Sequence, residues 1–446
     1  MNCKAGLGGM GAACPEIGRS TMAESFANVG IDPAKYKGMA AVVDEHGKTA
    51  SGPLRFCPTC EGIARLLSQV SDCAPEVELR FYIEACGWLW YAPAAILQEL
   101  GYKVYLVNPA YTKAQRKMSS PGAKSDFRDA QALARAPFNM GDRAEHIADV
   151  PVGIRLNLQN LCRHRLSLRQ DATAIQLRLI AWLGLTSPGL TAIIGTDLSE
   201  MDQSIIAQYP VISEMAGQDE ETVQAFLTEC ANGRAVDPAL AQELMGLAAE
   251  AYTPRDLDPK CIAIQVEIEL ARLELLQQQI ARLDREIASL LKLCDPHGYA
   301  QTLPGFGPVI AAILVAEAGV DVSRFEDAAH FASWTGMVAR AFGSSGKHVQ
   351  GLPMTKAGRS DVKWALYMAA KTASTRDPLL KDFYDRLRAD GKCHQEALVA
   401  VGHKLARWYW AIMNEQRPFE RREPETQQPQ AEPTPSEADN QQPVCA

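Results

Sequence analysis

Four acidic residues stand at the ends of short apolar segments or on one helix face, where together they could hold metal ions. Asp32 ends a run that begins at Asn28, and Glu84 ends an alternating segment, residues 77–84. Asp126 and Asp129 are three residues apart, which places both on one face of a helix. Four converging carboxylates repel one another unless cations neutralise them. The set therefore predicts a divalent metal site with all four as ligands.

Such a site would support chemistry at phosphorus. Hard carboxylate oxygens select Mg²⁺ or Mn²⁺ over zinc. Two such ions about 4 Å apart can activate a nucleophile and stabilise a leaving oxygen. Taken singly, each residue has a plainer explanation, because a helical DxxD is usually a solvated pair and a Glu at a strand end usually caps a neighbour. Only the order and context of all four favour the metal site.

The segments that must position these acids follow one another in an informative order. Strands are predicted at residues 28–32, 38–43, 48–52, 77–84 and 103–107, and helices at residues 62–70, 93–100 and 124–136. Three strands followed by alternating helix and strand is the order of a ribonuclease H-like α/β sheet. A dinucleotide-binding fold would need a glycine-rich turn after the first strand, where this sequence has Asp32-Pro-Ala-Lys35. The order therefore favours the ribonuclease H-like sheet.

The second half carries a glycine-bounded serine pair. Ser344 and Ser345 lie between Gly343 and Gly346, so a hydroxyl there could be presented without steric obstruction. A serine is a poor nucleophile until it is deprotonated or placed beside a metal or cation. The plain alternative is a flexible polar loop.

A turn upstream of this loop predicts a phosphate contact. The run Leu303-Pro-Gly305-Phe-Gly307 precedes an apolar helix. It resembles the hairpin of helix-hairpin-helix DNA binders, in which N–H groups at a helix start hold a phosphate. Simple helix packing is the alternative.

Basic residues are concentrated around the serine pair. Between residues 340 and 376 the only acid is Asp361, against seven basic residues: Arg340, Lys347, Lys356, Arg359, Lys363, Lys371 and Arg376. The chain as a whole has a net charge of −8, to which the tail from Glu420 contributes six acids against two arginines. The local basic stretch could therefore face phosphates on an acidic protein. Arg340 and Lys347 could stabilise charge at phosphorus.

The middle of the chain is predicted to be helical. Five arginines lie along its first helix, where a solvated face and nucleic-acid contact are equally favoured: Arg155, Arg163, Arg165, Arg169 and Arg178. A later segment has the spacing of a coiled-coil seam: Leu273, Leu276, Ile280, Leu283, Ile287 and Leu290. The seam could pair with a second protomer or with the same chain folded back, and we favour a dimer contact.

Cysteine spacing and hydropathy exclude other classes of protein. Cys57 and Cys60 form a CxxC that Cys73 could extend to three ligands, but no second pair completes a zinc site, so reduced thiols are favoured. No run of eighteen apolar residues and no secretory signal is found, so we expect a cytoplasmic protein without a membrane span.

The acidic segments together resemble one family. The segments Val29-Gly-Ile-Asp32, Tyr82-Ile-Glu84-Ala-Cys-Gly87, Val107-Asn-Pro109 and Lys124-Ser-Asp126-Phe-Arg-Asp129 are similar to the signatures of the DEDD-type insertion-sequence transposases, also described as bridge-RNA-guided recombinases. The second half adds Gly343-Ser-Ser345-Gly346-Lys347 and Lys356-Ala-Gly358. The resemblance covers residues 28–418.

The resemblance implies a fold, a mechanism and partners. The N-terminal domain would be RuvC-like, with Asp32, Glu84, Asp126 and Asp129 as catalytic metal ligands, and Ser345 would be the nucleophile. DNA would contact Gly305, Gly307, Arg340, Lys347, Lys356, Arg359 and Lys363. A structured noncoding RNA would specify donor and target DNA. The acidic domain of one protomer would meet the serine domain of another in a homo-oligomer, a dimer or tetramer.

The domain organisation expected from this reasoning has five parts. They are a flexible N-terminal extension (1–27), a RuvC-like DEDD domain (28–150), a helical linker and coiled coil (151–295), a mainly α serine-containing transposase domain with a helix-hairpin-helix-like turn (296–419) and a disordered acidic tail (420–446). A transposase or recombinase is favoured over two alternatives. One is a metal-dependent junction nuclease in which Ser345 is structural, and the other is a catalytically silent nucleic-acid-binding scaffold.

Overall fold

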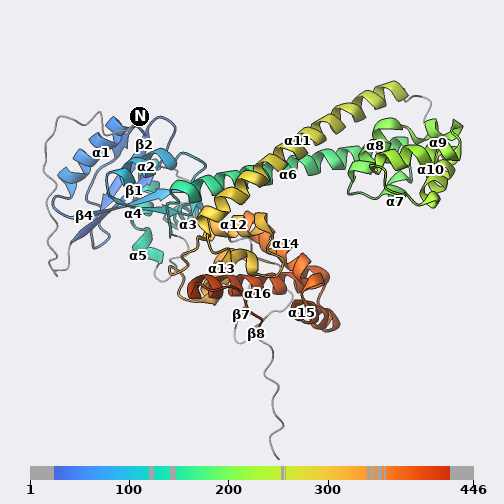
Figure 1. Cartoon of the computed structure of the whole chain (residues 1–446). Coiled ribbons are helices and arrows are strands. Elements are labelled where there is room, and N and C mark those ends of the chain that lie inside the picture. The colour runs from blue at the N-terminus through green and yellow to red at the C-terminus, as the bar shows by residue number, and fades with distance from the viewer. Residues whose placement is uncertain are drawn as a thin grey trace, which may run out of the picture.

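The computed structural model describes residues 25–119, 125–140, 147–252, 256, 258–338, 343–344, 347–348, 354–355 and 358–421. Figure 1 shows a sheet region, a pair of long helices that leads away to a helical tip, and a helical C-terminal body beside the base of that pair. The predictions for residues 1–24 and for the tail beyond residue 421 concern residues outside the described part of the chain.

A six-stranded sheet forms the first region. Its strands are β1 (Phe26–Asp32), β2 (Gly38–Val43), β3 (Leu54–Phe56), β4 (Glu78–Glu84), β5 (Lys103–Val107) and β6 (Ile147–Asp149). They lie in the order β3-β2-β1-β4-β5-β6. The first three strands are antiparallel, β4 and β5 continue parallel to β1, and β6 closes the edge antiparallel. The chain therefore has a mixed sheet with β1 and β4 at its centre.

Helices cover both faces of this sheet. The helices of the region are α1 (Cys60–Cys73), α2 (Tyr91–Glu99), α3 (Pro109–Ser119), α4 (Asp126–Ala134) and α5 (Ala136–Met140). One face packs Ile31 and Ile83 against α1 and α2. The other face packs Tyr82 against Leu133 of α4. Alternate residues of the central strands thus enter two separate cores.

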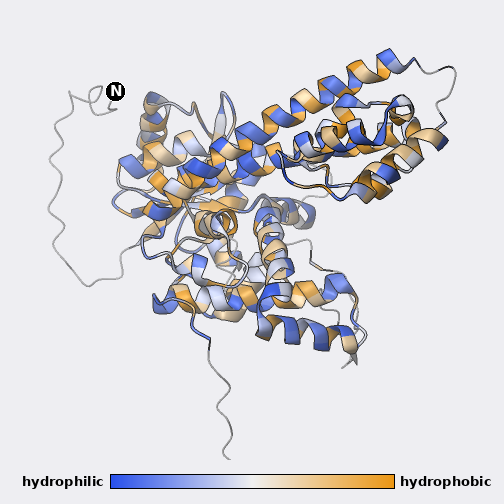
Figure 2. Cartoon of the chain, turned by 45° about the vertical axis from the view of Figure 1, so that its right-hand side comes forward, coloured by the Kyte–Doolittle hydropathy of each residue, from blue (hydrophilic) through white to orange (hydrophobic). Residues whose placement is uncertain are grey.

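Two long helices form an arm. Helix α6 (Gly153–Thr186) and helix α11 (Pro259–Cys294) are antiparallel, because the start of α6 shares a core with the end of α11 and the end of α6 shares a core with its start. Apolar residues recur along both helices (Figure 2). The contact buries Leu273, Ile280 and Ile287 completely or nearly so. The predicted seam is therefore filled by α6 of the same chain, so the favoured dimer contact through this seam is wrong and the folded-back alternative is confirmed.

The tip at the far end of the arm is entirely helical in the described residues. It comprises α7 (Leu190–Ile194), α8 (Glu200–Gln208), η3 (Ile212–Gly217), α9 (Glu220–Cys230) and α10 (Pro238–Glu250). Its core also takes in Leu179 of α6 and Val266 of α11. The tip and the far half of the arm thus form one packed unit.

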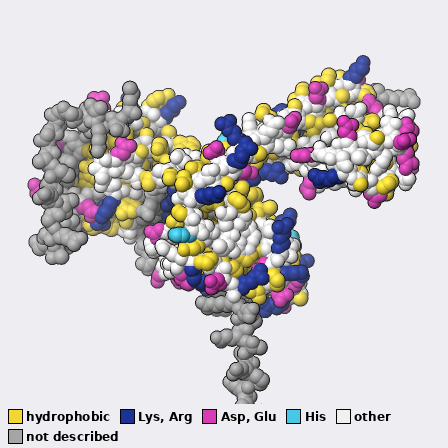
Figure 3. Space-filling view, in the orientation of Figure 1, with side chains coloured by type: hydrophobic (Ala, Val, Ile, Leu, Met, Phe, Trp, Pro, Cys, Tyr) yellow, Lys and Arg dark blue, Asp and Glu magenta, His cyan; other side chains and the backbone are white. Residues whose placement is uncertain are grey.

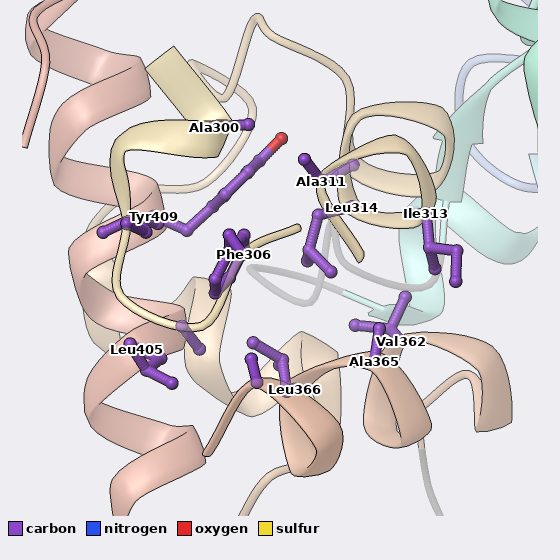
Figure 4. Packing of buried hydrophobic residues seen from close by; sticks show 14 of the residues in the cluster. Ala300, Phe306, Ala311, Ile313, Leu314, Val362, Ala365, Leu366, Leu405 and Tyr409 are labelled. Atoms are coloured by element: carbon purple, nitrogen blue, oxygen red, sulfur yellow. The ribbon is translucent and has the colours of Figure 1, made fainter. Parts of the chain in front are cut away.

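The C-terminal body is mainly helical. It comprises η4 (Tyr299–Thr302), α12 (Pro308–Ala318), α13 (Ala328–Thr335), the short strands β7 (Gly343–Ser344) and β8 (Lys347–His348), α14 (Ser360–Arg376), α15 (Pro378–Ala389) and α16 (His394–Glu415). Helix α12 is apolar around most of its circumference and is almost wholly buried. Figure 4 shows Leu314 of α12, Phe306 and Tyr409 in this core. Its buried residues also contact the base of the arm.

Most of the predicted strands and helices of the sheet region are confirmed, but the third strand was placed wrongly. Residues 48–52 form only an isolated bridge at Thr49, and β3 follows at Leu54–Phe56. The Ser51 hydroxyl accepts a hydrogen bond from the Val42 amide at 2.8 Å. The Val42 amide therefore bonds to the Ser51 side chain instead of to the backbone of a neighbouring strand. The short elements α3 and β6 were not predicted.

No helix in the described part of the chain is both long enough and apolar enough to cross a membrane. Cys57, Cys60 and Cys73 form no disulfide.

Candidate active site

The ends of β1 and β4 bring Asp32 and Glu84 together. The strands are parallel neighbours, and Gly30 pairs with Tyr82 in their register. Because side chains alternate along a strand, Asp32 shares a face with Gly30, and Glu84 shares it with Tyr82. Neighbouring strands are about 4.8 Å apart. Two half-buried carboxylates therefore lie side by side at one edge, on the face that α4 covers.

Helix α4 crosses this face antiparallel to β1. Phe138, just beyond the helix, stacks on Phe26 at the start of β1, with 6.3 Å between ring centroids. Ala130 instead lies at Gly30, farther along the strand. A Cβ atom at Gly30 would lie 1.9 Å from the Ala130 carbonyl oxygen and 2.4 Å from the Ala134 amide nitrogen. Glycine thus permits the close approach, and the first turn of α4 points to the far end of β1.

That first turn carries the other two acids. Asp126 is its first residue and is exposed, whereas Asp129 is buried. Acidic side chains are favoured in the first turn because the helix dipole is positive there. The structure therefore brings Asp32, Glu84 and Asp129 to one edge of one face, with Asp126 at its rim.

Two neighbours define the surroundings of Glu84. The hydroxyl of the buried Thr112 in α3 donates a hydrogen bond to Glu84 Oε1. Burial, with Tyr105 beside it, raises the pKa of Tyr82 to about 12. The phenol therefore stays neutral and adds no charge to this face. Sequence reasoning did not find Thr112, because a lone threonine in a helix carries no pattern.

The donor set suits a hard cation. Carboxylate and hydroxyl oxygens are the ligands that Mg²⁺ and Mn²⁺ prefer. Among the residues that the structure describes, however, no three carboxylate, imidazole or thiol groups lie close enough to hold one metal ion. The acids thus share an edge and a face without forming a closed ligand shell.

The predicted serine segment is described only in part. Strands β7 and β8 pair antiparallel, with Ser344 opposite Lys347. The candidate nucleophile Ser345 lies outside the described residues, as do Arg340 and Lys356. The structure therefore gives no geometry for the serine.

The predicted DNA contacts have different surroundings. Gly305 has a positive φ, and a Cβ there would lie 2.3 Å from the Ala369 carbonyl oxygen, so its role is close packing on α14. Gly307 is the exposed N-cap of α12. Lys363 Nζ donates to the Thr355 carbonyl at 3.4 Å, and Arg359 Nε lies 2.8 Å from Glu317 Oε2.

The arginines of α6 pair within the chain. Arg165 binds Asp284 at 2.7 Å, and Arg178 binds Glu269 at 3.0 Å. Arg163 reaches Glu317 at 2.8 Å. These three arginines are held by acids of the same chain, so they form neither a solvated face nor a face free for nucleic acid. Arg169, by contrast, is exposed.

Glu317 was missed by the sequence reasoning. Its carboxylate is buried in α12, where it accepts hydrogen bonds from Arg163 and Gln159 and forms an ion pair with Arg359. The available signal was a single acid inside an otherwise apolar run, residues 310–318, because a buried charge needs partners.

Two family models match separate parts of the chain. A model for the DEDD domain of IS110 elements, described as Transposase, matches residues 29–188. A model described as Transposase IS116/IS110/IS902 family matches residues 298–385. The first contains all four acids, and the second contains the serine pair and the basic stretch as far as Arg376.

By their names, several individual relatives belong to insertion elements and one inverts a pilin gene. An uncharacterized 44.8 kDa protein of insertion element IS116 from Streptomyces clavuligerus is 25% identical over 408 residues, covering 90% of this chain and 97% of the relative. An uncharacterized 43.6 kDa protein of IS110 from Streptomyces coelicolor is 26% identical over 343 residues, covering 74% and 81%. A pilin gene-inverting protein of Moraxella bovis is 29% identical over 155 residues, covering 32% of this chain and 46% of the relative.

Proposed function

Since the chain belongs to the IS110/IS116 family of insertion-element transposases, we propose that it cuts and rejoins DNA strands with a carboxylate-held metal site and one serine. The observation that carries the proposal is the gathering of Asp32, Glu84 and Asp129 from three separate elements onto one face. The strand order is that expected for a RuvC-like, ribonuclease H-like domain, which supports that assignment.

The carboxylates would hold Mg²⁺ or Mn²⁺, which would lower the energy of charge developing at phosphorus. Asp32 and Glu84 would form the fixed part of the site because both end central strands. Thr112 would orient the Glu84 carboxylate by its hydrogen bond. Asp126, exposed at the start of α4, would complete the set.

Ser345 would be the nucleophile. Its oxygen forms a bond to phosphorus and gives up its proton, while the bond from phosphorus to the leaving sugar oxygen breaks and that oxygen gains a proton. Attack by a sugar hydroxyl of a new strand reverses these changes and releases the serine. Covalent linkage conserves the phosphodiester for rejoining. Arg340 and Lys347 would stabilise the charge at phosphorus.

The assembly would be a homo-oligomer in which the acidic domain of one protomer serves the serine domain of another. Because α6 fills the α11 seam within one chain, the protomers would meet through other surfaces. A structured noncoding RNA would specify donor and target DNA, as the family resemblance implies.

A two-plasmid recombination assay in cells, supplied with the flanking noncoding DNA of the element, tests the mechanism. Ser345→Ala, Asp126→Ala and Asp129→Asn should each lower joined product by about 100-fold or more, whereas Ser344→Ala should not. Asp72→Asn is the matched control, because Asp72 is an exposed acid of α1, on the opposite face of the sheet.

The pattern of losses separates the mechanisms. Full recombination by Ser345→Ala would refute the serine assignment and favour either Ser344 or the metal-dependent nuclease. In the nuclease, Asp129→Asn would still abolish cutting, and no covalent protein–DNA species would form. Activity of Asp129→Asn equal to that of Asp72→Asn would refute the carboxylate site.

A further inference from the structure

A cleft of about 470 Å³ is lined by residues of the sheet region, the start of the arm and the C-terminal body. Gly87 and Asn108 line it from the sheet side, and the first turn of α14 lines it from the other. Ala85, the residue after Glu84, also lines it. The cleft therefore starts next to the carboxylate edge, but none of the four acids lines it.

Positive charge exceeds negative charge in this cleft. Its charged lining residues are four arginines and two acids: Arg155, Arg163, Arg324, Arg359, Glu317 and Asp361. The N-terminus of α14, a 17-residue helix, adds the positive end of a helix dipole at Ser360. An anion would be favoured here on both counts.

The buried acid fixes the arginines in place. Arg163 gives Glu317 a two-pronged contact, with Nε at 2.9 Å from Oε1 and an amino nitrogen at 3.1 Å from Oε2. Arg359 uses only Nε, at 2.8 Å. Because a guanidinium has five N–H donors, amino groups of both side chains remain for a ligand. Glu317 is thus a positioning residue for two cationic forks.

An exposed aromatic side chain lies beside the cleft. Trp88 is 54% exposed and stacks on the buried Trp90, which lines the cleft, with 6.4 Å between ring centroids. Basic grooves flanked by exposed aromatic rings are typical of sites for single-stranded nucleic acid, because unpaired bases stack on the rings. A small phosphate compound would not use Trp88.

We propose that this cleft holds the phosphodiester backbone of an unpaired nucleic-acid strand, with Arg163, Arg359 and the start of α14 as phosphate ligands and Trp88 as a base platform. The proposal rests on the proposed function only in taking nucleic acid as the ligand. An ion-paired joint between two domains would explain Glu317, and α12 carbonyls hold Arg155 and Arg324, but neither would require the exposed indole.

Fluorescence anisotropy of a short labelled strand, with the full-length protein in EDTA, tests the cleft without catalysis. Ser360→Glu places an acid in the cleft where a helix start tolerates it. It should weaken binding about tenfold without lowering the melting temperature. Ala239→Glu is the matched control, because it adds the same charge in the first turn of α10 at the tip.

Two further variants sharpen the result. Arg359→Gln should reduce the slope of log K against log salt by about one. Trp88→Ala should weaken binding of the single strand about tenfold while leaving a duplex nearly unaffected. DNA and RNA strands of one sequence are measured in parallel, and the strand whose binding falls in Ser360→Glu is the occupant.

Equal binding by wild type and Ser360→Glu, with an unchanged salt slope in Arg359→Gln, would overturn the proposal. Equal losses in Ser360→Glu and Ala239→Glu would also overturn it, because the change in net charge alone would then explain the weaker binding. If the cleft variants lose binding while Ser345→Ala still recombines, the cleft stands and the serine mechanism falls.

Discussion

The arginines of helix α6 have two kinds of partner. Near its start, Arg163 shares the buried Glu317 with Arg359, under a cleft in which positive charge exceeds negative charge. By contrast, Arg165 and Arg178 each pair with an acid of α11. Arg163 belongs to a group of charges around an opening, whereas Arg165 and Arg178 neutralise acids within the arm. A row of arginines on one helix therefore has no single function.

The regions at the two ends of the arm also differ in charge. Residues 187–258, the stretch of sequence between α6 and α11, contain thirteen acids against Arg234 and Arg255, a net charge of −11. The whole chain has only −8, so the remainder is basic. In Figure 3 the tip shows many Asp and Glu side chains, whereas Lys and Arg gather near the base of the arm. The total charge thus conceals a basic body that could bind DNA.

The largest expected effect comes from removing the buried acid. Glu317→Ala should lower the free energy of unfolding by about 3 kcal/mol, because Arg163 and Arg359 lose their shared acid. Urea denaturation measures the change. A loss no greater than that of Arg165→Ala would show that the cleft arginines are not held by Glu317, and the contrast between the arginines of α6 would fail.

A smaller effect is expected in the middle of the arm. The Arg165 side chain is 14% exposed and Asp284 is 35% exposed, so the pair is partly screened. Arg165→Ala should cost about 1 kcal/mol. A double-mutant cycle with Asp284→Ala isolates the pair, and additive losses would show that these two side chains do not interact in solution.

The smallest effect is expected at Arg178. Its pair with Glu269 is open to solvent on the arginine side, where water and salt screen the charges. Arg178→Ala should leave the urea midpoint unchanged within error and leave oligonucleotide binding at the wild-type level. A clear loss of binding would mean that the far half of the arm also contacts nucleic acid.

Local pattern predicted the carboxylate edge, because strand ends and an i,i+3 pair are visible in sequence. Asp32 and Glu84 indeed end β1 and β4, and Asp126 and Asp129 share the first turn of α4. Periodicity could not predict the partners of the α6 arginines, because an ion pair with a residue 91 to 154 positions away depends on tertiary packing. The spacing of the α11 seam likewise could not tell which helix it packs against, because a second protomer and the same chain folded back require the same spacing.

The arm has a consequence for reach. At about 1.5 Å per residue, the 36 residues of α11 extend about 54 Å, which is the length of about 16 base pairs of duplex at 3.4 Å each. Each residue inserted into both helices would turn the tip by about 100°, whereas a full heptad would lengthen the arm by about 10 Å and rotate the tip by only about 20°. The orientation of the tip about the arm is therefore set by the length of the two helices, and inserting seven residues changes it far less than inserting one.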